Sequence, residues 1–91
     1  MKVFLDFKNT SYEGMFGDII IPFFFSNWKQ VSLVEAEAVI VDNVEILVAY
    51  RRRFPEKRFA IIGDDIVSGW DDVVIIQVGS VMTGLTQLLL N

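Results

Sequence analysis

The sequence predicts a small three-layer α/β domain with a mostly parallel sheet of about four strands. The segment from Glu37 to Asp65 alternates between strand-like and helix-like patterns, and a parallel strand pair needs a crossover of about a dozen residues. The later run Val73–Val78 is almost wholly apolar, as in a strand buried on both faces. A length of 91 residues corresponds to one domain, residues 1–91.

The predicted strands lie near residues 2–7, 38–42, 58–63 and 73–78. Residues 8–18 are polar and contain glycines, which predicts a loop with a helical turn. Residues 19–25, IIIPFFF, fit either a buried helix kinked by Pro22 or an edge strand, where proline is tolerated. A helix is expected from about Trp28 to Glu35, with Ser26 or Asn27 as its N-cap.

The central segment favours a helix between the second and third strands. Asp42 can serve as its N-cap, with Glu45 completing a capping-box-like pair. Three arginines then occupy its last turn, next to the negative end of the helix dipole, and Pro55 ends it. The same residues also allow two hairpins, Asp42-Asn43 forming one turn, so an all-β or α+β meander is the alternative fold.

Helical spacing predicts which side chains of these helices face the sheet. In the central helix the predicted inner face comprises Val44, Leu47 and Val48, with Tyr50 and Phe54 beside them. The last helix, from Val81 to Leu90, is expected to bury Val81, Leu85, Leu88 and Leu89.

The composition excludes several chemistries. The chain contains no histidine, which excludes imidazole general bases, Ser-His triads and zinc sites of the usual kind. It contains no cysteine, so there is neither a disulfide nor thiolate chemistry, and a cytoplasmic location is expected. The net charge of −4 disfavours nonspecific nucleic-acid binding. The N-terminal residues lack the features of a signal peptide.

The hydrophobic fraction of 53% is high for a small domain and predicts a protein partner or a homo-oligomer. No apolar run reaches the roughly 20 residues of a membrane span. Three consecutive phenylalanines cannot all point inward from one regular element, so part of this aromatic group is expected to form an interface. The candidate interface residues are Phe23, Phe24, Phe25 and Trp28.

Two charged groups are candidate binding sites. The basic cluster, which could hold an anion or an acidic partner, consists of Arg51, Arg52, Arg53, Lys57 and Arg58. Acidic residues lie at or just after the ends of the first three strands and are expected at the carboxyl edge of the sheet, where open α/β sheets bind ligands. They can hold a divalent metal ion or cap the helices that follow. These residues are Asp6, Asp42, Asp64 and Asp65.

The motifs DFKN (Asp6, Asn9), EAVIVD (Glu37, Asp42) and IIGDD (Asp64, Asp65) resemble the acidic residues of PIN/NYN-type metal-dependent ribonucleases over residues 3–65. The resemblance implies that these carboxylates hold Mg²⁺ or Mn²⁺ and activate water against a phosphodiester. It also implies a nucleic-acid substrate.

Two functional interpretations follow. The preferred one is a non-catalytic protein-interaction or regulatory domain without a cofactor, acting through an apolar patch and the acidic sheet edge. The alternative is a Mg²⁺-dependent PIN-like ribonuclease or phosphodiesterase.

Overall fold

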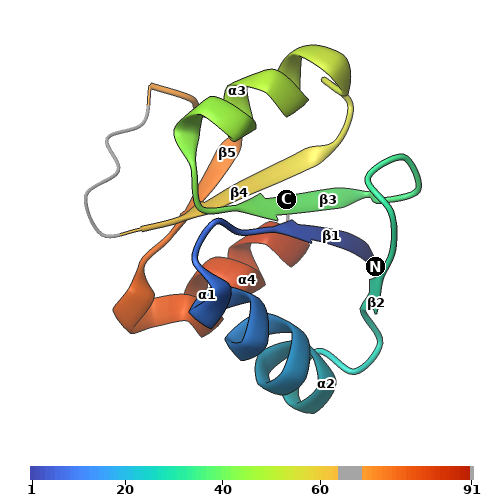
Figure 1. Ribbon diagram of the computed structural model, residues 1–91, viewed down its shortest axis with the longest axis vertical. Coiled ribbons are helices and arrows are strands. Elements are labelled where there is room, and N and C mark those ends of the chain that lie inside the picture. The colour runs from blue at the N-terminus through green and yellow to red at the C-terminus, as the bar shows by residue number, and fades with distance from the viewer. Residues whose placement is uncertain (64–68, 91) are drawn as a thin grey trace.

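A computed structural model describes residues 1–63 and 69–90 of the chain, and it confirms the predicted α/β class (Figure 1). The sheet has five strands, one more than expected, and all neighbouring strands are parallel. Their spatial order is β2-β1-β3-β4-β5. The strands are β1 (Lys2–Asp6), β2 (Lys29–Gln30), β3 (Ala38–Val41), β4 (Arg58–Ile62) and β5 (Val73–Ile76).

Helices cover both faces of this sheet (Figure 1). One face carries α4 and a continuous helical segment made of α1, the π-helical turn η1 and α2. The other face carries α3. The bounds are α1 (Thr10–Gly14), η1 (Met15–Ile20), α2 (Ile21–Phe24), α3 (Val44–Arg53), the 3-10 turn η2 (Val78–Ser80) and α4 (Val81–Leu90).

Strand alternation divides the core into two clusters. On the α4 face, β3 contributes Ala38 and Ile40, and these pack in one cluster with Leu85 and Leu88 of α4. On the α3 face, β3 contributes Val39 and Val41, which share the second cluster with Leu47 of α3. Because successive side chains of a strand point to opposite faces, the central strands read as continuous apolar runs.

Residues 19–25 are mainly helical, as in the first of the two predicted possibilities, but the predicted burial is wrong for Phe23 and Phe24, which are exposed. Pro22 explains the π-helical turn Met15–Ile20. A proline within a helix lacks an N–H donor, and its ring clashes with the carbonyl of the residue four positions earlier. The wider turn relieves this, because the Ile21 N–H donates to the Phe16 carbonyl, five residues back. The backbone is helical on both sides of this turn.

The helix predicted from Trp28 to Glu35 is wrong. Lys29–Gln30 forms a short edge strand beside β1 instead, and Trp28 is buried at 5% exposure. The reason is the open side of β1: the N–H groups of Lys29 and Val31 donate to the carbonyls of Met1 and Val3. An extended segment can donate hydrogen bonds to these β1 carbonyls, whereas the N–H groups of a helix would donate to carbonyls of the helix itself.

The N-cap of α3 is Asn43 and not Asp42, because the Asn43 Oδ1 accepts the Ile46 N–H at 3.1 Å. The predicted inner face of this helix is correct for Leu47, which is fully buried. It is wrong for Val44, which is 44% exposed at the first position of the helix, while Ile46 packs against the core.

The last helix also differs from the predicted face. Leu85 and Leu88 are buried, but Leu89 is 43% exposed. Gly84 is the cause: it lies so close to β5 that a Cβ there would sit 2.7 Å from the Ile76 Cγ1. Because Gly84 packs directly against β5, the buried face of α4 is centred on Gly84 and Leu88. Leu89 therefore lies at the side of this buried face.

Gly84→Ala is therefore expected to destabilise the fold by about 1 kcal/mol or more, because the strain of overpacking exceeds the gain in helix propensity. Gly79→Ala is the control, since its Cβ would meet nothing within 4 Å. Urea unfolding of both variants tests this, and a Gly84→Ala chain as stable as the wild type would contradict the close packing.

Candidate functional site

The carboxyl ends of β1 and β3 mark the switch in strand order. The chain leaves β1 for β2 on one side and then crosses to β3 on the other side of β1. In open α/β sheets this switch point is the usual place for a ligand. Asp6 ends β1, and Asp42 follows β3 directly, so the structure brings these two predicted residues to the same edge.

The Asp42 carboxylate joins two chain segments. Its Oδ1 accepts the Lys8 N–H and its Oδ2 accepts the Asn9 N–H, both at 2.9 Å. These donors belong to the turn between β1 and α1, so Asp42 ties that turn to the end of β3. Charge-assisted hydrogen bonds of this kind are stronger than neutral ones. Asp42 thus has a structural role that differs from the predicted helix cap.

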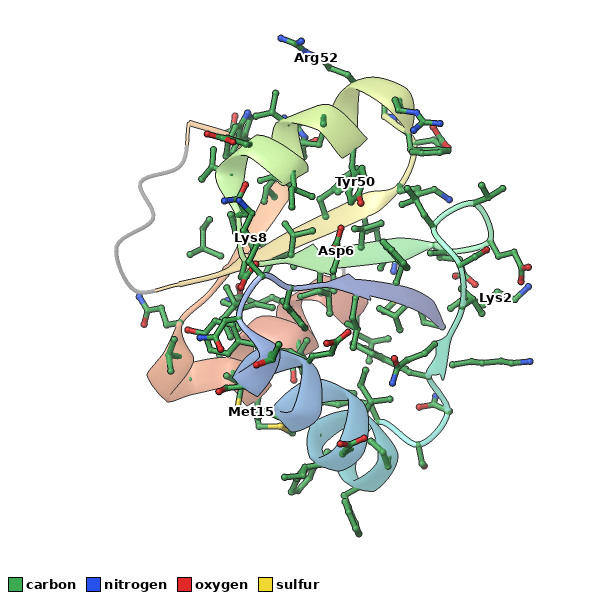
Figure 2. All side chains as sticks on the ribbon, in the orientation of Figure 1. Lys2, Asp6, Lys8, Met15, Tyr50 and Arg52 are labelled. Carbon is green, nitrogen blue, oxygen red and sulfur yellow. The ribbon has the colours of Figure 1, made fainter. Side chains whose placement is uncertain are left out.

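Asp6 is engaged by α3. The Tyr50 hydroxyl donates to the Asp6 Oδ2 at 2.6 Å, and Figure 2 shows the two side chains facing one another from α3 and β1. Tyr50 also packs edge-on against Phe4 of the same strand. Chiefly through the hydrogen bond, and then through burial and the negative charge of Asp6, the pKa of Tyr50 is raised to about 12.

Two asparagines complete this edge, and sequence reasoning missed their roles. Asn9 caps α1 by accepting the Ser11 N–H at 2.9 Å, as Asn43 caps α3. The sequence did offer one indication of the α3 cap, the adjacent pair Asp42-Asn43, because either residue is a favoured N-cap. The tertiary partners of Asp42 leave the cap to Asn43.

The predicted metal site is only partly within the described residues, because Asp64 and Asp65 lie outside them. Within residues 1–63 and 69–90, no three acidic side chains form a group that could hold a metal ion. Asp6 and Asp42 accept hydrogen bonds from different donors, as described above. Mg²⁺ binding stays a prediction of the PIN-like resemblance.

The predicted basic cluster lies toward the opposite, amino edge of the sheet, and its members diverge. Arg51 makes a salt bridge of 2.7 Å with Asp72 and lies over the Trp70 ring. Its hydrogen bond is the main cause that lowers the pKa of Asp72. Arg52 points away from the sheet (Figure 2).

The other basic residues contact different groups. Lys57 donates to the carbonyls of Val34 and Ala36. Arg58 reaches the Leu89 carbonyl at 3.5 Å, and Arg53 lies over the ring of Phe54.

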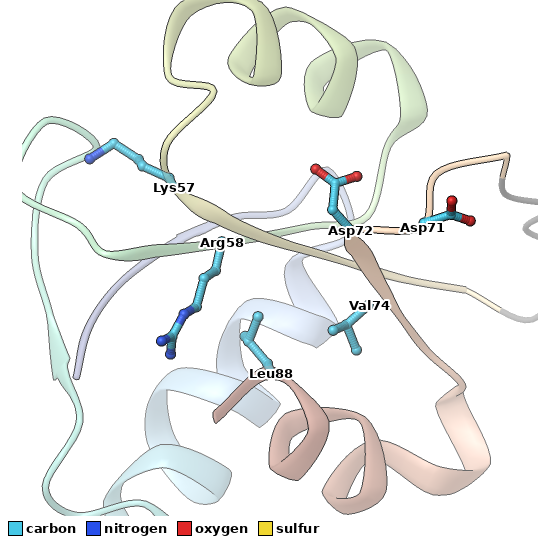
Figure 3. Close-up of a pocket in the computed structure, with 6 residues that line it drawn as sticks. All are labelled: Lys57, Arg58, Asp71, Asp72, Val74 and Leu88. Carbon is cyan, nitrogen blue, oxygen red and sulfur yellow. The ribbon is translucent and has the colours of Figure 1, made fainter. Parts of the chain in front are cut away.

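A hollow of about 280 Å³ lies at this edge between β4, β5 and α4 (Figure 3). Figure 3 shows Lys57 and Arg58 pointing in different directions, with Asp71 and Asp72 also on the wall. Its floor is apolar, formed by Val74 and Leu88. The mixture of charges gives no concentrated positive site for a phosphate.

The predicted aromatic interface divides into two parts. Phe25 and Trp28 are buried and stack with ring centroids 4.5 Å apart, so their assignment to a surface is wrong. They fill the space between the helical segment and the sheet edge. Phe23 and Phe24 are 76% and 63% exposed, which agrees with the expectation that the three phenylalanines cannot all point inward.

Asp42→Ala is expected to lower the free energy of unfolding by about 1–2 kcal/mol, since two backbone N–H groups lose a charged acceptor but remain accessible to water. This loss of unfolding free energy is expected to be the same with and without millimolar Mg²⁺ or Mn²⁺. The melting temperature of the wild type is also expected not to change when either ion is added. Asp18→Ala is the control, because it removes a carboxylate exposed on the helical segment. A metal-induced rise in melting temperature that Asp42→Ala abolishes would support the metal site instead.

The Tyr50 hydroxyl is expected to titrate near pH 12, and Asp6→Asn is expected to lower its pKa toward 10 because the hydrogen bond to a carboxylate is lost and, with it, the repelling charge. Between these pH values the folded chain keeps a proton that the unfolded chain releases, so stability falls as pH rises from about 10 to 12. The difference in tyrosinate absorbance between wild type and Tyr50→Phe isolates this group. A Tyr50 signal near pH 10 would contradict the hydrogen bond.

Comparison of the chain with models of known protein families, with curated proteins and with solved structures finds no match. None of the helices in the described residues has the length and apolar character needed to cross a membrane. The functional argument below therefore starts from the chain's own surfaces.

Proposed function

We propose that this chain is a small, non-catalytic protein-interaction domain that docks through an apolar surface of its helical layer. This surface, the helical stripe, consists of Ile19, Pro22, Phe23 and Phe24. The observation that carries the proposal is the exposure of the two phenylalanines, 76% and 63%, side by side on one short helix. Buried aromatic side chains are enriched at protein interfaces, where a few anchors supply most of the affinity.

The helical stripe is held on a firm support. Ile20 and Ile21 lie between Ile19 and Pro22 in the sequence, and both are buried in the core cluster under the sheet. At its end, Phe25 stacks on Trp28 inside the core. A surface whose backbone is fixed before binding loses less conformational entropy on association, so more of the contact energy appears as affinity.

The charges beside the stripe indicate the kind of partner. Glu13 and Asp18 are exposed on the same helical segment, and Asp18 directly precedes Ile19. The complementary partner is a protein with an apolar pocket for Phe23 and Phe24 and a rim of lysine or arginine. Rim charges of this type mainly increase the association rate and the selectivity.

The sequence predicted that the acidic sheet edge takes part in binding, whereas in this proposal its carboxylates have a structural role. Asp6 and Asp42 accept intramolecular hydrogen bonds, so their carboxylates support the fold that presents the stripe. These bonds favour the interaction domain over the PIN-like nuclease, whose mechanism needs strand-end carboxylates available to a metal ion.

Phe23→Glu is expected to weaken partner binding by about 30-fold or more, the effect of removing a hot-spot residue. Val34→Glu is the matched control, because Val34 is 74% exposed but lies outside the stripe, in the connection between β2 and β3. It is expected to change the dissociation constant by less than about threefold.

The measurement has two stages. Proteins retained by the immobilised wild-type chain are identified and purified, and each is then titrated calorimetrically with the wild type and both variants. Circular dichroism checks that the variants fold. If every retained protein binds the two variants equally well, the helical stripe is not the docking surface.

A further inference from the structure

The two edges of the sheet are built differently. The β2 edge is two residues long, is fully exposed and carries Lys29, features that discourage pairing with another chain. The β5 edge is four residues long, and its sequence VVII contains neither a charge nor a proline. A strand of this kind at a sheet edge is a template for a further strand.

The backbone of β5 offers hydrogen-bonding groups to such a strand. The Gly63 N–H donates to the Ile76 carbonyl at 3.0 Å, so the backbone groups of Ile76 and of Val74 face β4. By strand alternation, the N–H and C=O groups of Val73 and Ile75 face the other side. In the described part of the chain, no strand pairs with that side.

The segment that forms this edge and the helix beside it carries no charged side chain, although Asp71 and Asp72 directly precede β5. The chain has 8 basic and 12 acidic residues, yet none lies between Val73 and Asn91. A hollow of about 230 Å³ beside the strand is lined by uncharged residues of β5, of α4 and of the turn between them, including Ile75, Thr83 and Gln87. Depletion of charge is characteristic of the centre of protein interfaces.

We propose that β5 pairs with β5 of a second copy of this chain in antiparallel orientation, which joins two five-stranded sheets into one. The register places the two-fold axis at Ile75, so that Ile75 faces its own copy and Val73 faces Gln77. Ile75 then presents its backbone N–H and C=O to its own copy, and Val73 presents its groups to Gln77, whose carbonyl also accepts the Ser80 N–H of its own chain. The half-buried Ile75 side chains meet across the axis on the α3 face.

Charge identifies a second copy as the occupant. A chain of net charge −4 repels its own copy except where neither presents a charge, and β5 with α4 is such a region. In the proposed register, Asp71 and Asp72 lie opposite Gly79 and Val78, so no like charges are paired. A basic partner would instead be expected to select an acidic surface.

The two-fold axis is perpendicular to the joined sheet. The α4 faces of the two copies therefore lie on one side of the joined sheet, and the two α3 helices lie on the other side. The α4 helices flank the junction, where Thr83 and Gln87 face it without charge. The dimer presents both helical stripes to one side and can bind two partner sites at once, which raises avidity where the geometry permits. The strand pairing itself does not depend on the function of the stripe.

Light scattering after size-exclusion chromatography tests the pairing with the full chain at roughly 100 μM, above the Kd of a micromolar homodimer. The wild type is expected to show twice the 10.4 kDa mass of the chain. Gln87→Lys, which puts a charge beside the edge, is expected to shift the mass toward the monomer. Gln30→Lys is the matched control, an exposed glutamine on the β2 edge, and is expected to leave the dimer intact.

Amide hydrogen exchange provides a second readout. The N–H of Ile75 is expected to exchange slowly in the wild type at high concentration and faster in Gln87→Lys, with α3 amides unchanged. A wild type that is monomeric at this concentration overturns the pairing, as does a dimer that persists in both Gln87→Lys and Ile75→Lys. Dissociation by Phe23→Glu but not by Gln87→Lys also overturns it, and would place the contact between copies at the helical stripe.

Discussion

All neighbouring strands of this sheet are parallel, and that constraint governs the rest of the molecule. Each connection must carry the chain back across a face, and the sheet needs cover on both sides. A chain of 91 residues supplies two helical segments to one face and α3 to the other. Leu47 covers the centre of the α3 face, while Phe4 and Ile75 at its flanks are only partly buried. Apolar surface therefore remains available for other chains.

The same constraint collects polar groups at the carboxyl edge, where strands end and helices begin. Helix N-termini there carry N–H groups without helical partners, and the chain satisfies them from its own side chains. Asp42 holds the turn before α1, Asn43 caps α3, and Asp6 accepts from Tyr50. The position that binds ligands in many open sheets is thus used here to connect β1, β3 and α3.

The two proposed surfaces differ in chemistry because they arise from different elements. The helical stripe combines exposed aromatic rings with neighbouring carboxylates, which suits an apolar pocket with a basic rim. The β5 edge combines backbone hydrogen-bonding groups with uncharged neighbours, which suits a second strand of the same kind. In these two proposals the first surface takes a different protein and the second takes a copy of the same chain, so both could be occupied together.

Local pattern in the sequence determined the strands β1, β3, β4 and β5, the central helix and the last helix, since apolar periodicity and helix-ending residues act over a few positions. Tertiary structure alone decided which Asp or Asn caps α3, because Asp42 bonds with residues more than 30 positions away. It also decided that Lys29 extends beside β1, that Gly84 faces β5, and that Phe25 is buried while Phe24 is exposed. Each of these depends on a backbone or side chain from a distant segment, whose position local propensity does not encode.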